Sequence, residues 1–180
     1  MRKIFLCLGV PAFLLSCNSN TEKTAATSTS TATEPAKPAM EMPYTATYTS
    51  NWSNEVSDAD QKMVLMTYKD WSDNNMTGLL AAMADTVTIE MSSGLHKVLP
   101  RAELGKMWST YRDSLSSVRI EMESWNKMYA VDKKESYIVT WYNEYDTFKD
   151  GRVDSAAYHD INQVKDGKIM WYSQYKRPKK

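Results

Sequence analysis

The residues of this chain best suited to acid–base chemistry lie in the segment 153–164. Tyr158, Asp160 and Asn162 are two residues apart, so in an extended strand they would share one face. In an apolar cavity a carboxylate such as Asp160 loses hydration, and its pKa rises towards a value that suits proton abstraction next to a carbonyl. The alternative is an ordinary strand carboxylate that is solvated or paired with a Lys or Arg, and the spacing alone leaves both open.

A second set of polar and aromatic side chains lies in the segment 137–148. Trp141, Asn143 and Tyr145 follow the same two-residue spacing and would also share a strand face. If both faces lined one cavity, Tyr145 or Tyr158 could donate a hydrogen bond to a developing oxyanion. The amide of Asn143 would bind a ligand or support the structure, and Trp141 would be either a core residue or part of a ligand-binding wall.

Histidine and cysteine are too few for a metal site or a disulfide framework. His159 alternates away from the face of Asp160, and we expect both His96 and His159 at a surface or an interface. Cys7 and Cys17 are the only cysteines, and both precede the part of the chain that is expected to fold. We therefore expect no metal, no cofactor and no disulfide.

The first 17 residues have the pattern of a secretory signal peptide: two basic residues, an apolar run over 4–15 and a small residue before Cys17. This ending resembles the lipobox of bacterial lipoproteins, in which residues 1–16 are removed and Cys17 is acylated. Two or more acyl chains anchor a protein stably to a bilayer. The resemblance implies a protein of the bacterial cell envelope, and Asn18, in place of the Asp associated with inner-membrane retention, favours the outer membrane.

Two other interpretations of this segment are a signal peptide with a chance cysteine and an uncleaved membrane helix. The apolar run is shorter than the roughly 20 residues that a membrane-spanning helix needs. Pro11 within the run also disfavours a long stable helix. We therefore favour a lipidated Cys17.

Composition divides the chain into a signal peptide (1–16), a tether that starts at the lipidated cysteine (17–50) and a folded domain (51–180). From Asn18 to Pro43 there is no aromatic residue, Val, Ile or Leu, so this part of the tether cannot bury enough apolar surface to become ordered. The whole chain has 22 basic and 22 acidic side chains, and its one basic cluster, 176–180, is expected to be a solvated tail. Nucleic-acid binding needs a clustered basic face, so we expect no such partner.

Hydrophobic periodicity predicts three helices with one early strand, followed by a long sheet. The helices are expected to begin at Ser57, Thr77 and Pro100. The strands are expected at 86–91, 117–129, 137–148, 153–164 and 169–175. Gly151 and Gly167 mark tight hairpin turns between the last three. This order is typical of an α+β fold.

That order, with Asp166-Gly167-Lys168-Ile169 opening the final strand, resembles the nuclear transport factor 2-like superfamily and its SnoaL-like branch. The aromatic first helix that ends near Trp71, and the short helix that runs into the early strand, fit the same pattern. The resemblance implies a curved antiparallel sheet wrapped around about three N-terminal helices, a cone-shaped, cystatin-like α+β barrel with a pocket at its wide end. Members of the superfamily include isomerases, dehydratases and cyclases as well as non-catalytic domains, and many pair through the outer face of the sheet.

By analogy with that superfamily, the apolar Val164 before the final turn points into the cone. Asp160 would then point inward, and we expect the strand face of Trp141 to join it. The expected ligand-binding residues are Trp141, Asn143, Tyr158 and Asn162, and the expected catalytic residues of an enzyme would be Asp160 and Tyr145.

The sequence shows no catalytic dyad, so binding ranks before catalysis. We predict an envelope lipoprotein that binds a small apolar or aromatic ligand in the cone and forms a homodimer. The alternative is a metal-free, SnoaL-like isomerase, dehydratase or cyclase with Asp160 as its base.

Overall fold

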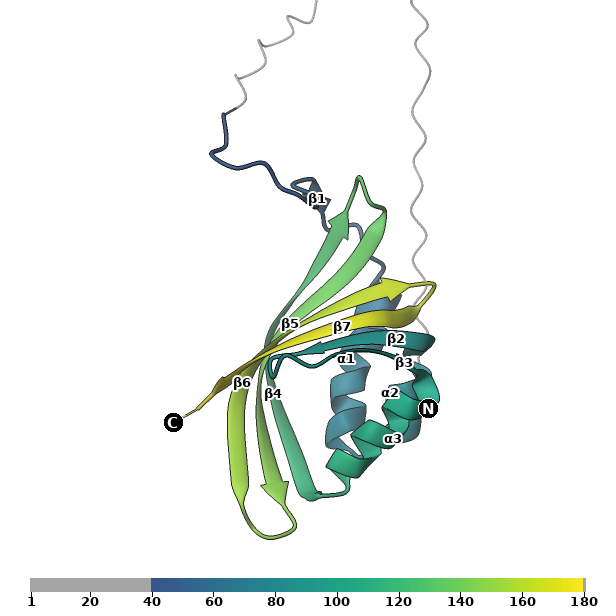
Figure 1. Ribbon diagram of the computed structural model, residues 1–180, viewed down its shortest axis with the longest axis vertical. Helices are drawn as coiled ribbons and strands as arrows, with labels where there is room; N and C mark the ends of the chain where they lie inside the picture. Colours follow the sequence, from purple (N-terminus) through teal and green to yellow (C-terminus); the bar gives the residue numbers. More distant parts are fainter. Residues whose placement is uncertain (1–39, 180) are drawn as a thin grey trace, which may run out of the picture. The chain divides into compact units, whose positions relative to one another are not determined.

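The computed structural model describes residues 40–179 (Figure 1). Cys17, the predicted signal peptide and most of the predicted tether lie outside these residues. The helices are α1 (Asp58–Ser72), α2 (Met76–Ala81) and α3 (Arg101–Arg112). The strands are β1 (Trp52–Ser53), β2 (Met83–Met91), β3 (His96–Pro100), β4 (Leu115–Ala130), β5 (Glu135–Phe148), β6 (Val153–Lys165) and β7 (Lys168–Pro178). All of them belong to one unit, Pro43–Lys180, and none of its helices is long and apolar enough to cross a membrane.

Side-chain caps set the starts of the first two helices. Ser57 caps α1, because its hydroxyl accepts the Asp60 amide proton at 3.0 Å. Asn75 caps α2 by accepting from the Gly78 amide at 3.1 Å, so the predicted cap at Thr77 was wrong by two residues. The third helix follows Pro100 as predicted.

The sheet has the strand order β1-β4-β5-β6-β7-β2-β3, and every neighbouring pair is antiparallel except β2 and β7. The β6–β7 hairpin turns through Asp166 and Gly167, which both have positive φ, as a tight two-residue turn requires. Register shifts interrupt β4 between Met122 and Ser124 and the β6–β7 ladder between Gln163 and Val164. Such irregularities bend strands and increase their twist, and here they accompany a strongly curved sheet.

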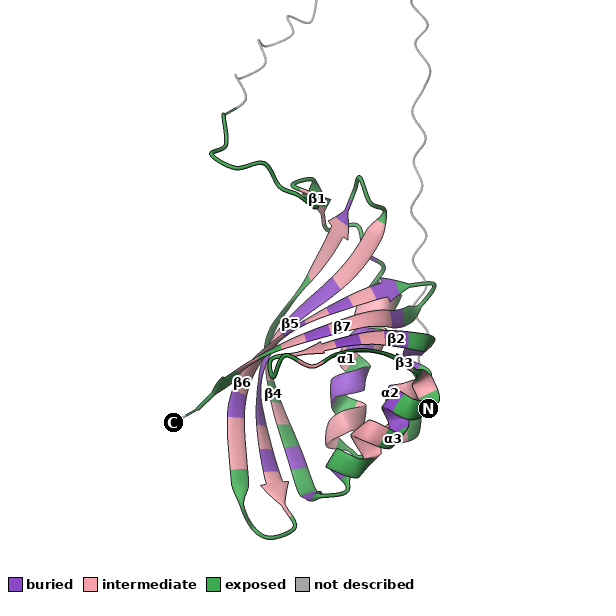
Figure 2. Ribbon diagram, viewed as in Figure 1, coloured by how far each residue is buried: buried purple, intermediate pink, exposed green. Residues whose placement is uncertain are grey.

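The three helices lie in the hollow of this curved sheet (Figure 1). Buried positions recur along the central strands and on the sheet-facing side of α1 (Figure 2). The core that joins the two layers includes Val64, Leu79, Leu104, Val87, Ile138 and Ile169, which are all less than 10% exposed. Each fully buried aliphatic side chain stabilises the fold by roughly 1.5–3 kcal/mol. The predicted fold class is therefore confirmed: a cone of mixed α+β structure with a curved, mostly antiparallel sheet.

The segment that leads into α1 is attached to the β4–β5 hairpin. Trp52 and Ser53 pair with Ala130 and Tyr129 of β4. The Tyr48 hydroxyl lies 2.8 Å from that of Tyr137, and Trp52 packs edge-on against the Tyr137 ring. The folded unit therefore begins with an aromatic segment that is bound to one end of the sheet.

Candidate functional site

A cavity of about 390 Å³ lies between the helices and the concave face of the sheet, and it is partly open to solvent. Its walls are mainly aromatic and thioether side chains. The rings come from Tyr68, Trp71, Trp108, Tyr111, Tyr142, Tyr158 and Tyr172, and the thioethers from Met83, Met91 and Met107. The volume falls within the roughly 300–1,000 Å³ of small-molecule sites, which are mostly apolar with a few polar groups.

Helical spacing and ring contacts hold the helical wall of this cavity. Trp108 and Tyr111 are three residues apart on α3, so they lie on the same face of the helix. The Tyr111 ring is parallel to that of Trp71, with centroids 6.2 Å apart. Trp108 meets Tyr172 of β7 edge to face at 6.4 Å. The aromatic walls are thus joined across the two layers.

A buried carboxyl lies behind the sheet side of the cavity. Asp160 is fully buried, and its Oδ2 accepts hydrogen bonds from the hydroxyls of Tyr142, Tyr68 and Tyr172 at 2.9, 3.1 and 3.1 Å. Its Oδ1 has no partner among the described residues. Burial raises the pKa of Asp160 to about 7, although the tyrosine hydroxyls oppose this shift.

A second layer of amides and hydroxyls orients these tyrosines. Asn162 Nδ2 donates to the Tyr68 hydroxyl at 3.2 Å. Gln174 Nε2 donates to the hydroxyls of Tyr172 and Tyr142 at 2.5 and 3.3 Å. Burial and the charge of Asp160 also raise the pKa of all three tyrosines, which keeps them as protonated donors. Tyr142 and Tyr172 line the cavity, whereas Asp160 does not, so the tyrosines stand between Asp160 and a ligand.

The carboxyl that does reach the cavity belongs to Glu144. Its residue is 8% exposed and lines the cavity. No Lys or Arg of residues 40–179 is in ion-pair contact with it. Burial, and then the negative charges of Asp146 and Asp160, raise its pKa.

Two further charged residues, Asp146 and Lys176, lie around Glu144. Asp146, on the same strand face as Glu144, accepts a hydrogen bond from the Tyr111 hydroxyl at 2.9 Å. Lys176 lines the cavity, but its ammonium lies 3.1 Å from Asp154 and is partly neutralised by it. Within residues 40–179, no group of three or more acidic, His or Cys side chains is arranged to hold a metal ion.

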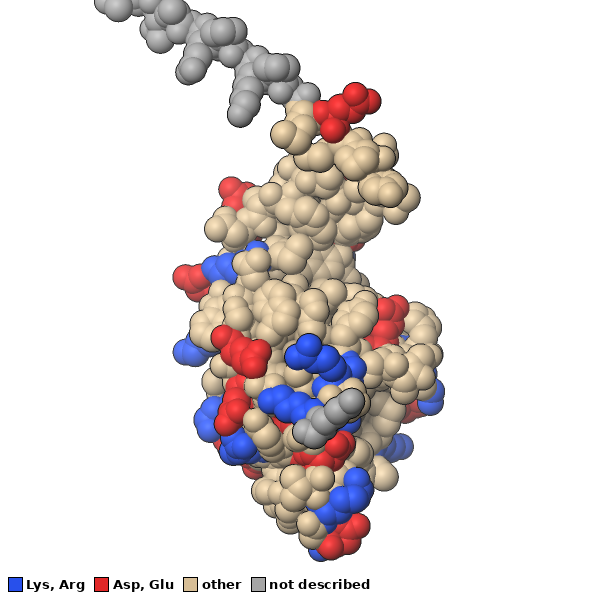
Figure 3. All heavy atoms as spheres, turned by 90° about the vertical axis from the view of Figure 1, so that its left-hand side faces the viewer, with Lys and Arg blue, Asp and Glu red and all other residues tan. Residues whose placement is uncertain are grey.

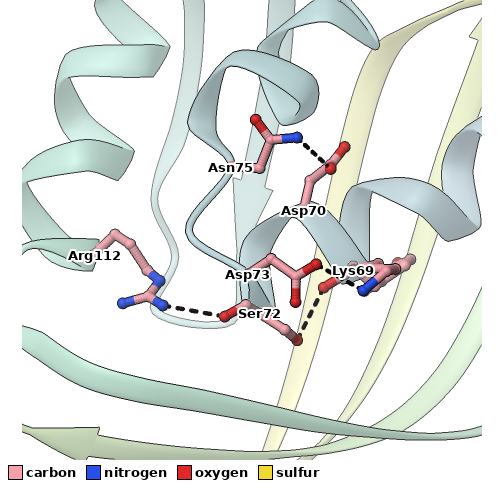
Figure 4. Close-up of polar contacts among 7 residues, drawn as sticks. Lys69, Asp70, Ser72, Asp73, Asn75 and Arg112 are labelled. Atoms are coloured by element: carbon pink, nitrogen blue, oxygen red, sulfur yellow. Dashed lines mark hydrogen bonds and ion pairs between the residues drawn. The ribbon is translucent and has the colours of Figure 1, made fainter.

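The loop after α1 is held by one buried cation. Arg112, at the end of α3, is 5% exposed and donates to the backbone oxygen of Trp71 at 3.1 Å. It also donates to that of Ser72 at 3.2 Å (Figure 4). A third contact reaches the Leu115 oxygen at 3.5 Å. The first two bonds reach carbonyls at the end of α1, where helix carbonyls lack intrahelical donors, and they hold the backbone of Trp71, whose side chain lines the cavity.

The concave face of the sheet includes only part of the predicted site. Asp160, Tyr158 and Asn162 lie on it, and the last two line the cavity. Trp141, Asn143 and Tyr145 lie on the opposite face, so the prediction that they join Asp160 was wrong. In an antiparallel pair, residues opposite each other share a face, and Trp141 lies opposite His159 rather than Asp160.

The outward-facing residues have partners of their own. Trp141 stacks on His159 with ring centroids 4.8 Å apart. Asn143 donates to Glu123 at 2.5 Å, and the Tyr145 hydroxyl donates to Glu121 at 3.0 Å. The inward residues of β5 that the sequence analysis missed are Thr140, Tyr142, Glu144 and Asp146; their two-residue spacing was visible, but the choice between the two faces was not.

Solved structures show which fold this is. A nuclear transport factor 2-like protein of unknown function from Burkholderia pseudomallei has a TM-score of 0.56 and 14% identity, over 67% of this chain and 92% of its own. A ketosteroid isomerase-like protein from Erwinia carotovora atroseptica has a TM-score of 0.56 and 13% identity, over 71% and 100%. An LEH-like epoxide hydrolase from M. tuberculosis has a TM-score of 0.56 and 9% identity, over 66% and 83%.

No family model and no curated protein matches the chain. At these low identities the structural likeness shows the fold alone, which is the one that nuclear transport factor 2-like and ketosteroid isomerase-like proteins share. Some proteins with this fold are enzymes, the epoxide hydrolase among them. The function of this chain therefore has to be argued from its own cavity.

Proposed function

We propose that this protein binds a small, largely apolar or aromatic ligand in the cavity on the concave face of its sheet. The observation that carries the proposal is the cavity itself, which is of ligand size and is walled by seven aromatic residues and three methionines. Methionine side chains adapt to the shape of a ligand, and Tyr and Trp offer both apolar area and polar tips.

Binding of N-phenyl-1-naphthylamine, a neutral aromatic probe that fluoresces in apolar surroundings, tests this proposal. The chain from Asn18 to Lys180, which retains the whole unit Pro43–Lys180, should enhance its fluorescence in a saturable way. Met91→Trp, which fills space at the cavity wall, should abolish this signal. Val98→Trp, at a position 60% exposed outside the cavity, should leave it intact. Lack of saturable binding, or equal binding by both variants, would overturn the proposal.

We also propose that Cys17 carries a lipid that anchors the protein in the bacterial envelope, in the outer membrane by preference. The support is the sequence pattern of residues 1–17. Mass spectrometry of the protein from membranes should find a chain that starts at an acylated Cys17. Cys17→Ser should release the protein from the membrane fraction, and an unmodified Cys17 would contradict the anchor.

The outer face of the sheet supports a third proposal, that two copies of the chain associate there. Trp141, His159 and Tyr175 form a continuous run of rings across β5, β6 and β7, with centroid distances of 4.8 and 5.9 Å. Tyr175 is 55% exposed, although it is a large aromatic residue. Trp141 and His159 are partly exposed, and an outward-facing group of rings of this kind is typical of a protein interface.

Glu144 favours a second candidate function, an acid–base enzyme. A carboxylate with a raised pKa at a cavity wall, near the Tyr158 phenol, suits proton abstraction from a carbon acid. Glu144 rather than Asp160 would act as the base, because Asp160 does not line the cavity. Deuterium exchange into cyclohexanone that is abolished by Glu144→Gln would support catalysis, and exchange at the rate of the buffer would exclude it for this class of substrate.

A further inference from the structure

Acidic side chains outnumber basic ones in and directly behind the cavity wall. The carboxyls of Asp146 and Asp160 lie close enough to Glu144 to act on its pKa through their charge. The one basic side chain in the cavity wall is Lys176, and it pairs with Asp154 at 3.1 Å. The basic and acidic groups around the cavity therefore do not balance, and the excess is acidic.

Glu144 is the carboxyl of this group that reaches the cavity, and it has no cationic partner among residues 40–179. It is more than nine-tenths buried, it lines the cavity, and none of the ion pairs within residues 40–179 includes it. A buried carboxylate is unfavourable unless a positive charge or hydrogen-bond donors compensate it. A positive charge that compensates Glu144 can approach it from the cavity.

The rings of the cavity wall also suit a cation. The face of an aromatic ring carries partial negative charge and attracts ammonium groups within about 6 Å of its centroid. One contact of this kind is already present, since the Lys176 ammonium lies 5.6 Å from the centroid of Tyr158. Trp71, Trp108 and Tyr111 offer further rings on the helical side.

We infer that the ligand is an organic monocation, an alkyl- or arylammonium compound whose apolar part lies among the rings and whose nitrogen lies at Glu144. This inference rests on the proposed binding function and names the chemical class of its ligand. It predicts weaker binding of anionic ligands, which the ionised form of Glu144 would repel.

Binding of such a cation is coupled to the release of a proton from Glu144. Glu144 faces Asp146 on its own strand, Asp160 and Tyr158 on β6, Lys176 on β7, Trp71 on α1 and Tyr111 on α3. Arg112 lies behind Trp71, 6.0 Å from its ring, and is bonded to backbone oxygens. An arriving positive charge lowers the raised pKa of Glu144, so binding releases a proton and strengthens as pH rises.

Two probes of equal shape test the inference. Benzyltrimethylammonium carries the charge, and neopentylbenzene replaces its nitrogen by carbon. At pH 8 the chain from Asn18 to Lys180 should bind the cation at least about tenfold more tightly than the neutral probe. Glu144→Gln should remove this preference, and Glu121→Gln, on the outer face, should keep it.

The outcomes distinguish failure of the cation inference from failure of the proposed binding function. Equal or tighter binding of the neutral probe by the wild-type chain overturns the cation inference and leaves the proposed binding function in place. Binding of neither probe overturns both. If Glu144→Gln does not fold, the wild-type chain still decides, because its affinity for the cation should rise from pH 6 to pH 9 while that for the neutral probe stays constant.

Discussion

Asp160 carries a buried carboxyl that changes its charge close to neutral pH. Burial raises its pKa in the folded protein to about 7, from 3.8 for an unperturbed Asp. At pH values between these two pKa values, the Asp160 carboxyl is protonated in the folded state and ionised in the unfolded state. The stabilisation that this group provides is therefore complete below pH 4 and is lost as pH rises to 7.

Asp160→Asn should remove this part of the pH dependence. The wild-type free energy of unfolding should fall by a few kcal/mol between about pH 4 and pH 7, and the variant should lose much of that slope. Urea denaturation at several pH values measures it. Asp85→Asn, whose side chain is 93% exposed, is the matched control and should follow the wild type. A variant with the full wild-type slope would show that Asp160 is not the titrating group.

At this scale the sequence predicted which residues of β6 share a face, but not which residues of β5 join them. Alternation placed Tyr158, Asp160 and Asn162 on one face, and the structure agrees. The face of β5 could not be chosen in the same way, because that choice depends on which residue of β6 lies opposite each residue of β5. A shift of one residue exchanges Trp141 for Tyr142 in the cavity.

At the scale of helices and strands, the elements with local sequence signals could be predicted, and those that depend on pairing with a distant strand could not. The hairpin turns and the first helix have local signals, namely Gly151, Gly167 and the Ser57 cap, and all were predicted. The short strand β3 was missed, because its backbone hydrogen bonds depend on β2 lying beside it. The start of α2 was misplaced because Asn75 and Thr77 are both good caps, and contacts with the end of α1 favour Asn75.

Arg112 joins α1, α3 and β4, so its loss should weaken all three. Arg112→Met removes the donor to the backbone oxygen of Ser72 and one of the donors to that of Trp71, and it should lower the free energy of unfolding by roughly 2–4 kcal/mol. Chemical denaturation measures this change. Arg119→Met is the control, because the Arg119 side chain is 57% exposed and its ion pair with Glu121 should contribute under 1 kcal/mol. Equal losses in the two variants would contradict the assigned role of Arg112.

At the scale of the whole molecule, the two faces of the sheet differ in chemistry. The inner face holds the cavity. Figure 3 looks from the side opposite the helices and shows Lys and Arg interspersed with Asp and Glu among uncharged surface, without a large patch of one sign. A face of this kind does not repel a second copy of itself, and the partly exposed rings of Trp141, His159 and Tyr175 give it an apolar centre.

If the chain associates through this face, Tyr175→Glu should dissociate it. The added carboxylates would lie near one another at a symmetric interface and would have to lose their hydration. Light scattering should give the mass of a dimer for the wild-type chain and that of a monomer for the variant. Val98→Glu, at an exposed position on β3, should leave the dimer intact. A wild-type chain that stays monomeric at high concentration would contradict the proposed dimer.

Methionine methyl NMR tests ligand binding in the cavity most directly, because it reports where a ligand lies. Met83, Met91 and Met107 line the cavity, while Met42 and Met66 are 69% and 41% exposed and do not. On titration with N-phenyl-1-naphthylamine, we predict saturable shifts of the three cavity methyl signals and constant positions for the other two. Unchanged cavity signals at saturating probe, or equal shifts of all methionines, would contradict a ligand site on the concave face.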